Sequence, residues 1–216
     1  MNLIQLFTDC LNMPYIQVEN DGSYYVKKTG NSLYIFLESS NGENDWKNNL
    51  DFWPISLCKS CNLPIKPYRD METCWYAHRG FLRVWKSIEK CIANDILNSR
   101  YRKIITVGYS HGAALAVLCH EFIWFNRPDL RASVEGYGFG CPRVFWGRKK
   151  DEVLRRWENF TVIRNINDIV TYVPPSWLGF SHVGKILTIG EKGKYSAIDA
   201  HRPENILKEL QRYEAT

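Results

Sequence analysis

The pentapeptide at positions 108–112, Gly-Tyr-Ser-His-Gly, has the residue types and spacing of a serine nucleophile held on a sharp turn. An apolar run from Lys103 to Val107 precedes it, and a second apolar run from Ala113 to Phe125 follows it. These runs predict a strand and a buried helix. Gly-x-Ser-x-Gly between two such elements exposes the serine oxygen, because the glycines let strand and helix approach closely. The pattern therefore predicts acyl transfer with Ser110 as the nucleophile.

A serine hydroxyl needs an imidazole to accept its proton and a carboxylate to orient that imidazole. The chain has five histidines. Where the acid and the base follow the serine in the chain, as in α/β-hydrolases, His78 is excluded, and His111 and His120 are poorly placed on the turn and its helix. His182 and His201 remain as candidates for the base.

Asp168 is the candidate for the carboxylate, because it follows an apolar run from Phe160 to Ile166 that predicts a strand. A catalytic acid would have to stand at such a carboxyl end. The alternative interpretation is a turn formed by Asn167 and Asp168. Asp199 is a weaker candidate, because its closeness in sequence to His201 would demand an awkward local geometry.

Strand and helix patterns alternate along the chain. Residues 40–77 contain three prolines and many asparagines, so they predict an irregular loop or pocket rim. The alternation predicts a single α/β domain over residues 1–216, with a mostly parallel central sheet and helices on both faces. Predicted strands are 23–28, 32–38, 103–107, 133–139, 160–166 and 183–189, and predicted helices are 80–98, 113–125, 150–158, a short one within 1–11 and a last one opened by Pro203.

Composition and charge exclude several classes of function. Hydrophobic residues make up 45% of the chain and charged residues 24%, as in ordinary globular proteins. The net charge of +5 is mild and no long basic run occurs, which argues against nucleic acid as a partner. No apolar run approaches the ~18 residues of a transmembrane helix.

The N-terminal residues and the cysteines predict a cytoplasmic protein. Residues 1–11 lack a basic leader and a cleavage signal of small residues, so we predict no signal peptide. Four of the seven cysteines lie inside apolar patterns, which is typical of reduced, buried thiols. These four are Cys10, Cys91, Cys119 and Cys141.

Cys58 and Cys61 form a C-x-x-C pair that could hold zinc or cycle as a redox pair. A structural zinc needs four ligands, and Cys74 and His78 are the nearest residues in sequence that would complete such a set. A loop with two plain thiols is the favoured interpretation, and we predict no metal and no organic cofactor.

Five segments in order along the chain together resemble the class 3 lipases, whose familiar members are the fungal triacylglycerol lipases and their plant relatives. The resemblance runs from about Leu33 to the C-terminus and implies an α/β-hydrolase fold. The five segments are Leu33–Ser40 with Asp45-Trp46 and Leu50, His78-Arg79-Gly80-Phe81, Gly108–Ala116, Gly138-Phe139-Gly140-Cys141-Pro142-Arg143-Val144, and Asn167-Asp168-Ile169-Val170 through Pro174-Pro175.

The resemblance implies a role for each site residue. His201, before a short terminal helix, matches the position of the catalytic histidine, whereas His182 matches a His-x-Gly element and would form a loop hydrogen bond. His78 is interpreted as a structural anchor. The oxyanion hole would consist of the backbone N–H of His111, the residue after the nucleophile, and of Ser40.

Two departures from the family pattern concern the same site. Glu38-Ser39 replaces the usual Arg-Gly before Ser40, which removes a permissive glycine and adds an acid. Tyr109 stands where the family commonly has His, and His111-Gly112-Ala113 replaces Leu-Gly-Gly. We expect the His111 side chain to point outward.

The predicted function is that of a serine carboxylic-ester hydrolase, a lipase or esterase that acts on lipid or small acyl esters with transient contact to a lipid surface. The segment Asn41–Asn49 is short and polar apart from Trp46, so a carboxylesterase, phospholipase or monoacylglycerol hydrolase fits as well as a triacylglycerol lipase. A catalytically silent lipase-like binding or regulatory module is the alternative. Its sign would be a missing triad residue, and none is missing. Acyl chain, alcohol and oligomeric state stay open.

Overall fold

The computed structural model describes residues 2–38, 54–56, 75–147 and 150–215. Several residues named above lie outside the described residues, as does the segment 41–49: Ser39, Ser40, Leu50, Cys58, Cys61 and Cys74.

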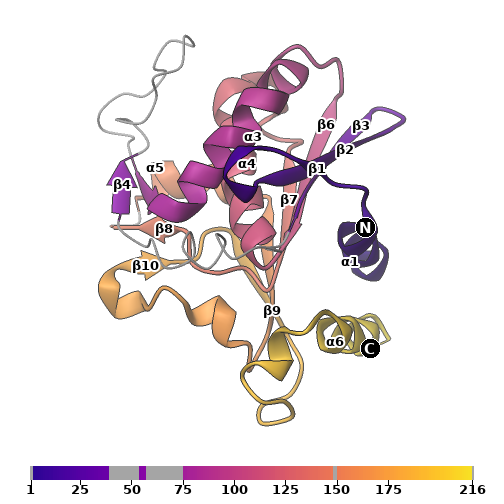
Figure 1. Cartoon of the computed structure of the whole chain (residues 1–216), viewed down its shortest axis with the longest axis vertical. Coiled ribbons are helices and arrows are strands. Elements are labelled where there is room, and N and C mark those ends of the chain that lie inside the picture. Colours follow the sequence, from indigo (N-terminus) through magenta and orange to yellow (C-terminus); the bar gives the residue numbers. More distant parts are fainter. Residues whose placement is uncertain (1, 39–53, 57–74, 148–149, 216) are drawn as a thin grey trace.

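A seven-stranded sheet forms the centre of the molecule, in the order β1-β2-β3-β6-β7-β9-β11 (Figure 1). The antiparallel pairs are β1 with β2 and β2 with β3, and all pairs from β3 to β11 are parallel. The predicted mostly parallel sheet is therefore confirmed. The strands are β1 (Ile16–Gln17), β2 (Ser23–Thr29), β3 (Ser32–Leu37), β6 (Lys103–Tyr109), β7 (Glu135–Phe139), β9 (Phe160–Asn165) and β11 (Lys185–Ile189).

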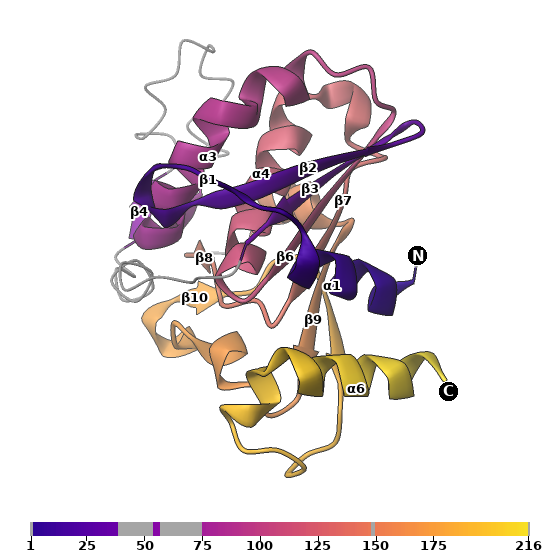
Figure 2. The same cartoon turned by 45° about the vertical axis from the view of Figure 1, so that its right-hand side comes forward.

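Helices cover both faces of this sheet, as predicted. The N-terminal helix α1 (Leu3–Asn12) and the C-terminal helix α6 (Pro203–Glu214) lie side by side on one face, whereas α3 (Arg79–Leu97) and α4 (His111–Asn126) cover the other (Figures 1 and 2). Each face has its own apolar core. None of the described helices is long and apolar enough to cross a membrane.

Helix α4 is surrounded by protein on all sides of its first three turns. Every residue from His111 to Ile123 is buried, which explains why its sequence is apolar all round rather than on one face. Helix α3, in contrast, has a buried stripe that includes Phe81, Val84 and Ile88, at the spacing that predicted it.

A second, four-stranded antiparallel sheet was not predicted. It has the order β10-β8-β5-β4 and lies beside α3. Its strands are β4 (Pro54–Ser56), β5 (Tyr76–His78), β8 (Phe145–Trp146) and β10 (Phe180–Ser181). The prediction of an irregular segment over 40–77 is thus wrong at β4 and β5, because strands of two or three residues are too short to show a periodic pattern.

Two further predictions need correction. The helix expected over 150–158 is a four-residue α5 (Asp151–Leu154) that continues as a 3₁₀ turn over Arg155–Trp157. Among the described cysteines, Cys10, Cys119 and Cys141 are buried thiols as predicted, but Cys91 is exposed on α3. The apolar residues beside Cys91 in sequence belong to the buried stripe, and its own position faces away from it.

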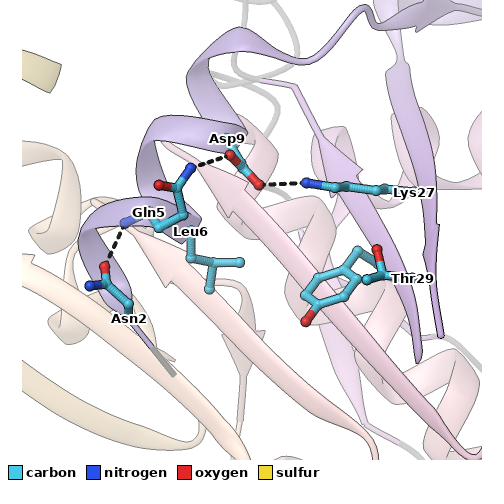
Figure 3. A pocket seen from close by; sticks show the side chains of 7 residues that line it. Asn2, Gln5, Leu6, Asp9, Lys27 and Thr29 are labelled. Atoms are coloured by element: carbon cyan, nitrogen blue, oxygen red, sulfur yellow. Dashed lines mark hydrogen bonds and ion pairs between the residues drawn. The ribbon is translucent and has the colours of Figure 1, made fainter. Parts of the chain in front are cut away.

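A shallow pocket lies between α1 and the β2–β3 hairpin (Figure 3). At its wall, Asp9 accepts a hydrogen bond from Gln5 Nε2 at 2.7 Å and forms an ion pair with Lys27 at 2.8 Å. This pair fastens α1 to the outer strands of the sheet. Thr29 and Tyr34 also line the pocket, close to the start of β3 and hence to the opposite end of the strand from the predicted nucleophile.

Candidate active site

Ser110 occupies the turn between β6 and α4, where the sequence places the nucleophile. Its backbone has φ 54° and ψ −122°, a conformation that residues other than glycine rarely adopt. Such a conformation persists only when the surrounding structure holds it in place. The N–H of Ser110 donates to the carbonyl oxygen of Phe139 on β7 at 2.9 Å, and its own carbonyl accepts from Ala113 at 3.0 Å. The turn is thus fixed by the neighbouring strand and by the helix that it opens.

Steric contacts explain why both flanking positions of the turn are glycines. A Cβ on Gly108 would lie 2.1 Å from the carbonyl oxygen of Gly112, and a Cβ on Gly112 would lie 2.1 Å from the carbonyl oxygen of Leu37. Both distances are far inside van der Waals contact with backbone atoms. Glycine at both positions is therefore required for β6, α4 and the end of β3 to meet.

The structure brings Ser110, His201 and Asp168 together. His201 Nε2 lies 2.8 Å from Ser110 Oγ, and His201 Nδ1 lies 2.8 Å from Asp168 Oδ2. With a proton on Nδ1, the imidazole donates to the carboxylate and accepts from the serine hydroxyl, which is the arrangement of a general base. The three residues follow β6, β9 and β11, so they meet at the carboxyl ends of parallel strands.

Asp168 is fully buried and uses both carboxylate oxygens. Oδ1 accepts from the N–H of Val170 at 2.9 Å, while Oδ2 meets the imidazole. The two interpretations of this residue from the sequence, a turn former and an orienting acid, therefore both describe it. Asp199, the weaker candidate, is engaged elsewhere, because its carboxylate pairs with Arg202 at 3.0 Å.

His182 supports the acid loop rather than the nucleophile. Its Nε2 lies 2.7 Å from the carbonyl oxygen of Thr171, and the hydroxyl of Thr171 donates to the carbonyl of Asp168 at 2.8 Å. From the other side, the N–H of Arg143 donates to the carbonyl of Val173 at 2.8 Å. The expected loop hydrogen bond of His182 is confirmed.

His78 also has the structural role that was expected of it. It is buried, its Nδ1 accepts from the N–H of Phe81 at 3.4 Å, and its ring stacks on that phenylalanine with centroids 3.9 Å apart. The residue thus caps the N-terminus of α3.

The loop that carries His201 is fixed by residues to which the sequence analysis assigned no role. Asn165 Nδ2 donates to the carbonyl of Ala200 at 3.1 Å. The buried carboxylate of Glu209 on α6 accepts from Lys194 Nζ at 2.7 Å and from the Tyr195 hydroxyl at 2.8 Å, which ties this loop to the helix. These contacts join segments that are distant in sequence, so no local pattern reveals them.

Gly140 is a further site residue without a predicted role. It has φ 56°, and a Cβ there would lie 2.9 Å from His201 Cε1, 3.0 Å from His201 Nδ1 and 3.1 Å from Asp168 Oδ2. Its position inside the Phe-Gly-x-Pro-Arg-Val segment is the signal that could have found it.

The side chain of His111 does not point outward as expected. It is 2% exposed, and its ring lies 5.4 Å from the ring of Phe81. The expectation is wrong because α4 is enclosed by protein from its first residue onward. Burial lowers the pKa of His111 to about 4, so its imidazole is neutral at pH 7.

The backbone N–H of His111 lies in the first turn of α4, immediately after Ser110. N–H groups at this end of a helix point along its axis, where the helix dipole favours negative charge. This location suits the oxyanion donor that was predicted for His111. The second predicted donor, Ser40, lies outside the described residues.

Two buried histidines should make the fold sensitive to acid. Burial lowers the pKa of both His111 and His120 to about 4. For His120, hydrogen bonds to the backbone of Glu135 and Arg156, and more weakly the nearby carboxylates, oppose this effect without overcoming it. The unfolded chain takes up protons below pH ~6.5, whereas the folded chain takes them up only near pH 4. We expect the free energy of unfolding to fall by roughly 2 to 3 kcal/mol per histidine between pH 7 and about 4.5, measured by urea denaturation.

His120→Leu is the matched test, because the ring of His120 is fully buried and packs edge-on against Phe160. This variant should lose roughly 2 kcal/mol less than the wild type over the same pH interval. An equal loss in both proteins would contradict the assignment.

Gly140→Ala should disturb the His201–Asp168 pair. We expect the rate at which a fluorophosphonate labels Ser110 to fall about 10- to 100-fold, because small displacements of a reacting group are costly. Gly30→Ala is the matched control, since Gly30 has φ 55° and a Cβ added there would meet no described atom within 4 Å. Equal labelling rates in the two variants would contradict the assignment, because the added Cβ at position 140 would then have no effect on Ser110 through its contact with His201.

The comparisons with known proteins agree with this geometry. The family model "Lipase (class 3)" matches residues 34–177, two thirds of the chain. The matched range includes Ser110 and Asp168 and ends before His201.

Solved lipase structures share the fold. The triacylglyceride lipase of Rhizomucor miehei is 22% identical over 82% of this chain and 66% of its own, with a TM-score of 0.66. A triacylglycerol lipase whose catalytic centre is a serine protease triad is 23% identical over 82% and 66%, with a TM-score of 0.63. The mono- and diacylglycerol lipase of Aspergillus oryzae is 19% identical over 87% and 66%, with a TM-score of 0.61. This chain thus spans just under two thirds of the length of each, and it shares their α/β-hydrolase fold. From the extent of the family match, the chain belongs to the class 3 lipase family.

Proposed function

We propose that the protein hydrolyses carboxylic esters through an acyl-enzyme on Ser110. The observation that carries the proposal is the continuous chain of two 2.8 Å contacts from Ser110 Oγ through the His201 imidazole to Asp168. Such a chain lets the imidazole take the serine proton while the carboxylate stabilises the imidazolium that forms.

The reaction would proceed in two steps. Ser110 Oγ forms a bond to the ester carbonyl carbon while its proton passes to His201 Nε2. The tetrahedral species then expels the alcohol, which takes that proton, and the acyl group remains on the serine. In the second step, water gives a proton to the same nitrogen and attacks the acyl-enzyme, which releases the acid and restores Ser110.

The negative charge of the tetrahedral species needs donors that are already in place. The backbone N–H of His111 is one such donor by its position at the start of α4. Ser40 is the second donor that the family resemblance implies. The buried, neutral imidazole of His111 adds no charge to the site at pH 7.

A lipid ester is the substrate class that the surface near the acid and the base favours. Five large apolar side chains are exposed on the loop that follows Asp168 and just before His201: Ile169, Tyr172, Val173, Trp177 and Ile198. Trp177 is the most exposed of them, at 81%. Exposed apolar side chains on loops that carry site residues suit transient contact with a lipid aggregate. Two fungal neighbours act on acylglycerols, by their names, and that substrate class is extended to this chain as part of the proposal.

Ser110→Ala tests the chemistry. Turnover of a short-chain p-nitrophenyl ester should fall about 10³-fold or more, because the nucleophile is lost while the fold is kept. Ser133→Ala is the control, since the hydroxyl of Ser133 bonds locally to the carbonyl of Leu130, and it should keep full activity. A Ser110→Ala enzyme as active as the wild type, or a wild-type serine that does not react with a fluorophosphonate, would favour the silent binding module instead.

Trp177→Ser tests the substrate class. Hydrolysis of an emulsified long-chain acylglycerol should fall about tenfold because the variant loses an exposed apolar anchor, while hydrolysis of a soluble short-chain ester should not change. The control is Ile16→Ser, which removes an apolar residue that is 51% exposed on β1 at the far edge of the sheet. Equal rates of Trp177→Ser and wild type on the emulsion would count against lipid contact at this loop.

A further inference from the structure

Tyr109 is the last residue of β6 and directly precedes the nucleophile. Its ring lies against the imidazole of His201, with centroids 5.1 Å apart and an angle of 25° between the planes. Its hydroxyl donates to the main-chain carbonyl of His201 at 2.6 Å. One side chain thus contacts both the ring and the backbone of the candidate base.

The Tyr109 ring is itself held in place from behind. Phe7 of α1 packs edge-on against it, with centroids 5.6 Å apart, and the same phenylalanine contacts Phe139 at 4.6 Å. Tyr109 is 8% exposed, and burial, together with the nearby charge of Asp168, raises the pKa of its hydroxyl. The hydroxyl therefore stays protonated over the working range of pH and acts as a donor to His201.

His201 otherwise depends on a different part of the molecule from Ser110. It ends a three-residue 3₁₀ turn between β11 and α6, and its side chain is 17% exposed. A shift of this turn relative to β6 would change the distance between His201 Nε2 and the oxygen of Ser110. Tyr109 contacts His201 and is the residue next to Ser110 in the chain, so its contact fixes the position of the histidine directly relative to the serine.

We propose that Tyr109 is a positioning residue, which orients the imidazole of His201 toward Ser110 by holding its ring face and its main-chain carbonyl. This inference rests on the proposed ester hydrolysis. The role belongs to this chain's own residues, since Tyr109 stands at one of its departures from the family pattern.

The test compares Tyr109→Phe with Tyr137→Phe. Tyr137 lies on the adjacent strand β7 and donates its hydroxyl to Glu135 at 3.1 Å, so its variant loses one tyrosine hydroxyl without touching His201. Reactive sites are first counted by the burst of p-nitrophenol from a soluble ester. We expect turnover per reactive site to fall about 3- to 10-fold in Tyr109→Phe, the effect of losing one hydrogen bond, with KM unchanged and Tyr137→Phe like the wild type.

Tyr109→Leu removes the stacked ring as well and should lower turnover per site further, by about 10- to 100-fold. A fall in the number of reactive sites with unchanged turnover per site would assign Tyr109 to folding alone and overturn the positioning role. Wild-type turnover per site in Tyr109→Phe would overturn it as well. If the wild type itself shows no turnover that depends on Ser110, the proposed function fails first, and the positioning role fails with it.

Discussion

The close approach of β6, α4 and the end of β3 around Ser110 is the constraint on which the rest of the site depends. At Gly108 and Gly112, backbone atoms come so near to each other that no side chain fits between them. The serine between these glycines has a positive φ, and its oxygen meets the imidazole of His201 at 2.8 Å. It also sets where α4 begins, and with it the N–H of His111. The position of Ser110 and that of the His111 N–H, the proposed oxyanion donor, thus depend on one backbone packing arrangement.

The base and the acid reach the serine from segments that follow two other strands of the same sheet. Asp168 and His201 follow β9 and β11, and α6 begins two residues after the histidine. Their positions depend on side-chain contacts: Val170 on the carboxylate, Asn165 on the turn before the imidazole, and Tyr109 on the imidazole itself. Both the serine turn and the loops of the acid and the base lie at the carboxyl edge of the parallel sheet. Three segments that are distant in sequence can therefore form one triad there.

The site residues that could be predicted from the sequence are those whose positions are marked by the residues next to them in the chain. Ser110 and Asp168 could be placed because a strand pattern stands directly before each and because turn chemistry marks both positions. The choice between His201 and His182 needed the family resemblance, since neither has a local sign of its role. Asn165 and Tyr109 contact the main chain around His201 from across the sheet, so these contacts became visible only in three dimensions, whereas Gly140 could have been found only through its family segment. The outward orientation expected for His111 was wrong for the same reason: the apolar sequence of α4 shows that the helix is buried, but not that the enclosure begins at its first residue.

The serine is held by backbone packing and the histidine by side-chain contacts, and this difference has an evolutionary consequence. The serine is held by main-chain atoms and by two glycines at which a Cβ would clash with backbone atoms, so a side chain at either glycine would displace the whole turn. The loop of the histidine is held by separate side chains, Tyr109, Asn165 and Glu209, so the loss of one of them leaves the contacts of the other two in place. Substitutions during divergence can therefore change the orientation of the histidine in small steps, whereas a change at the serine turn alters the backbone of the site as a whole.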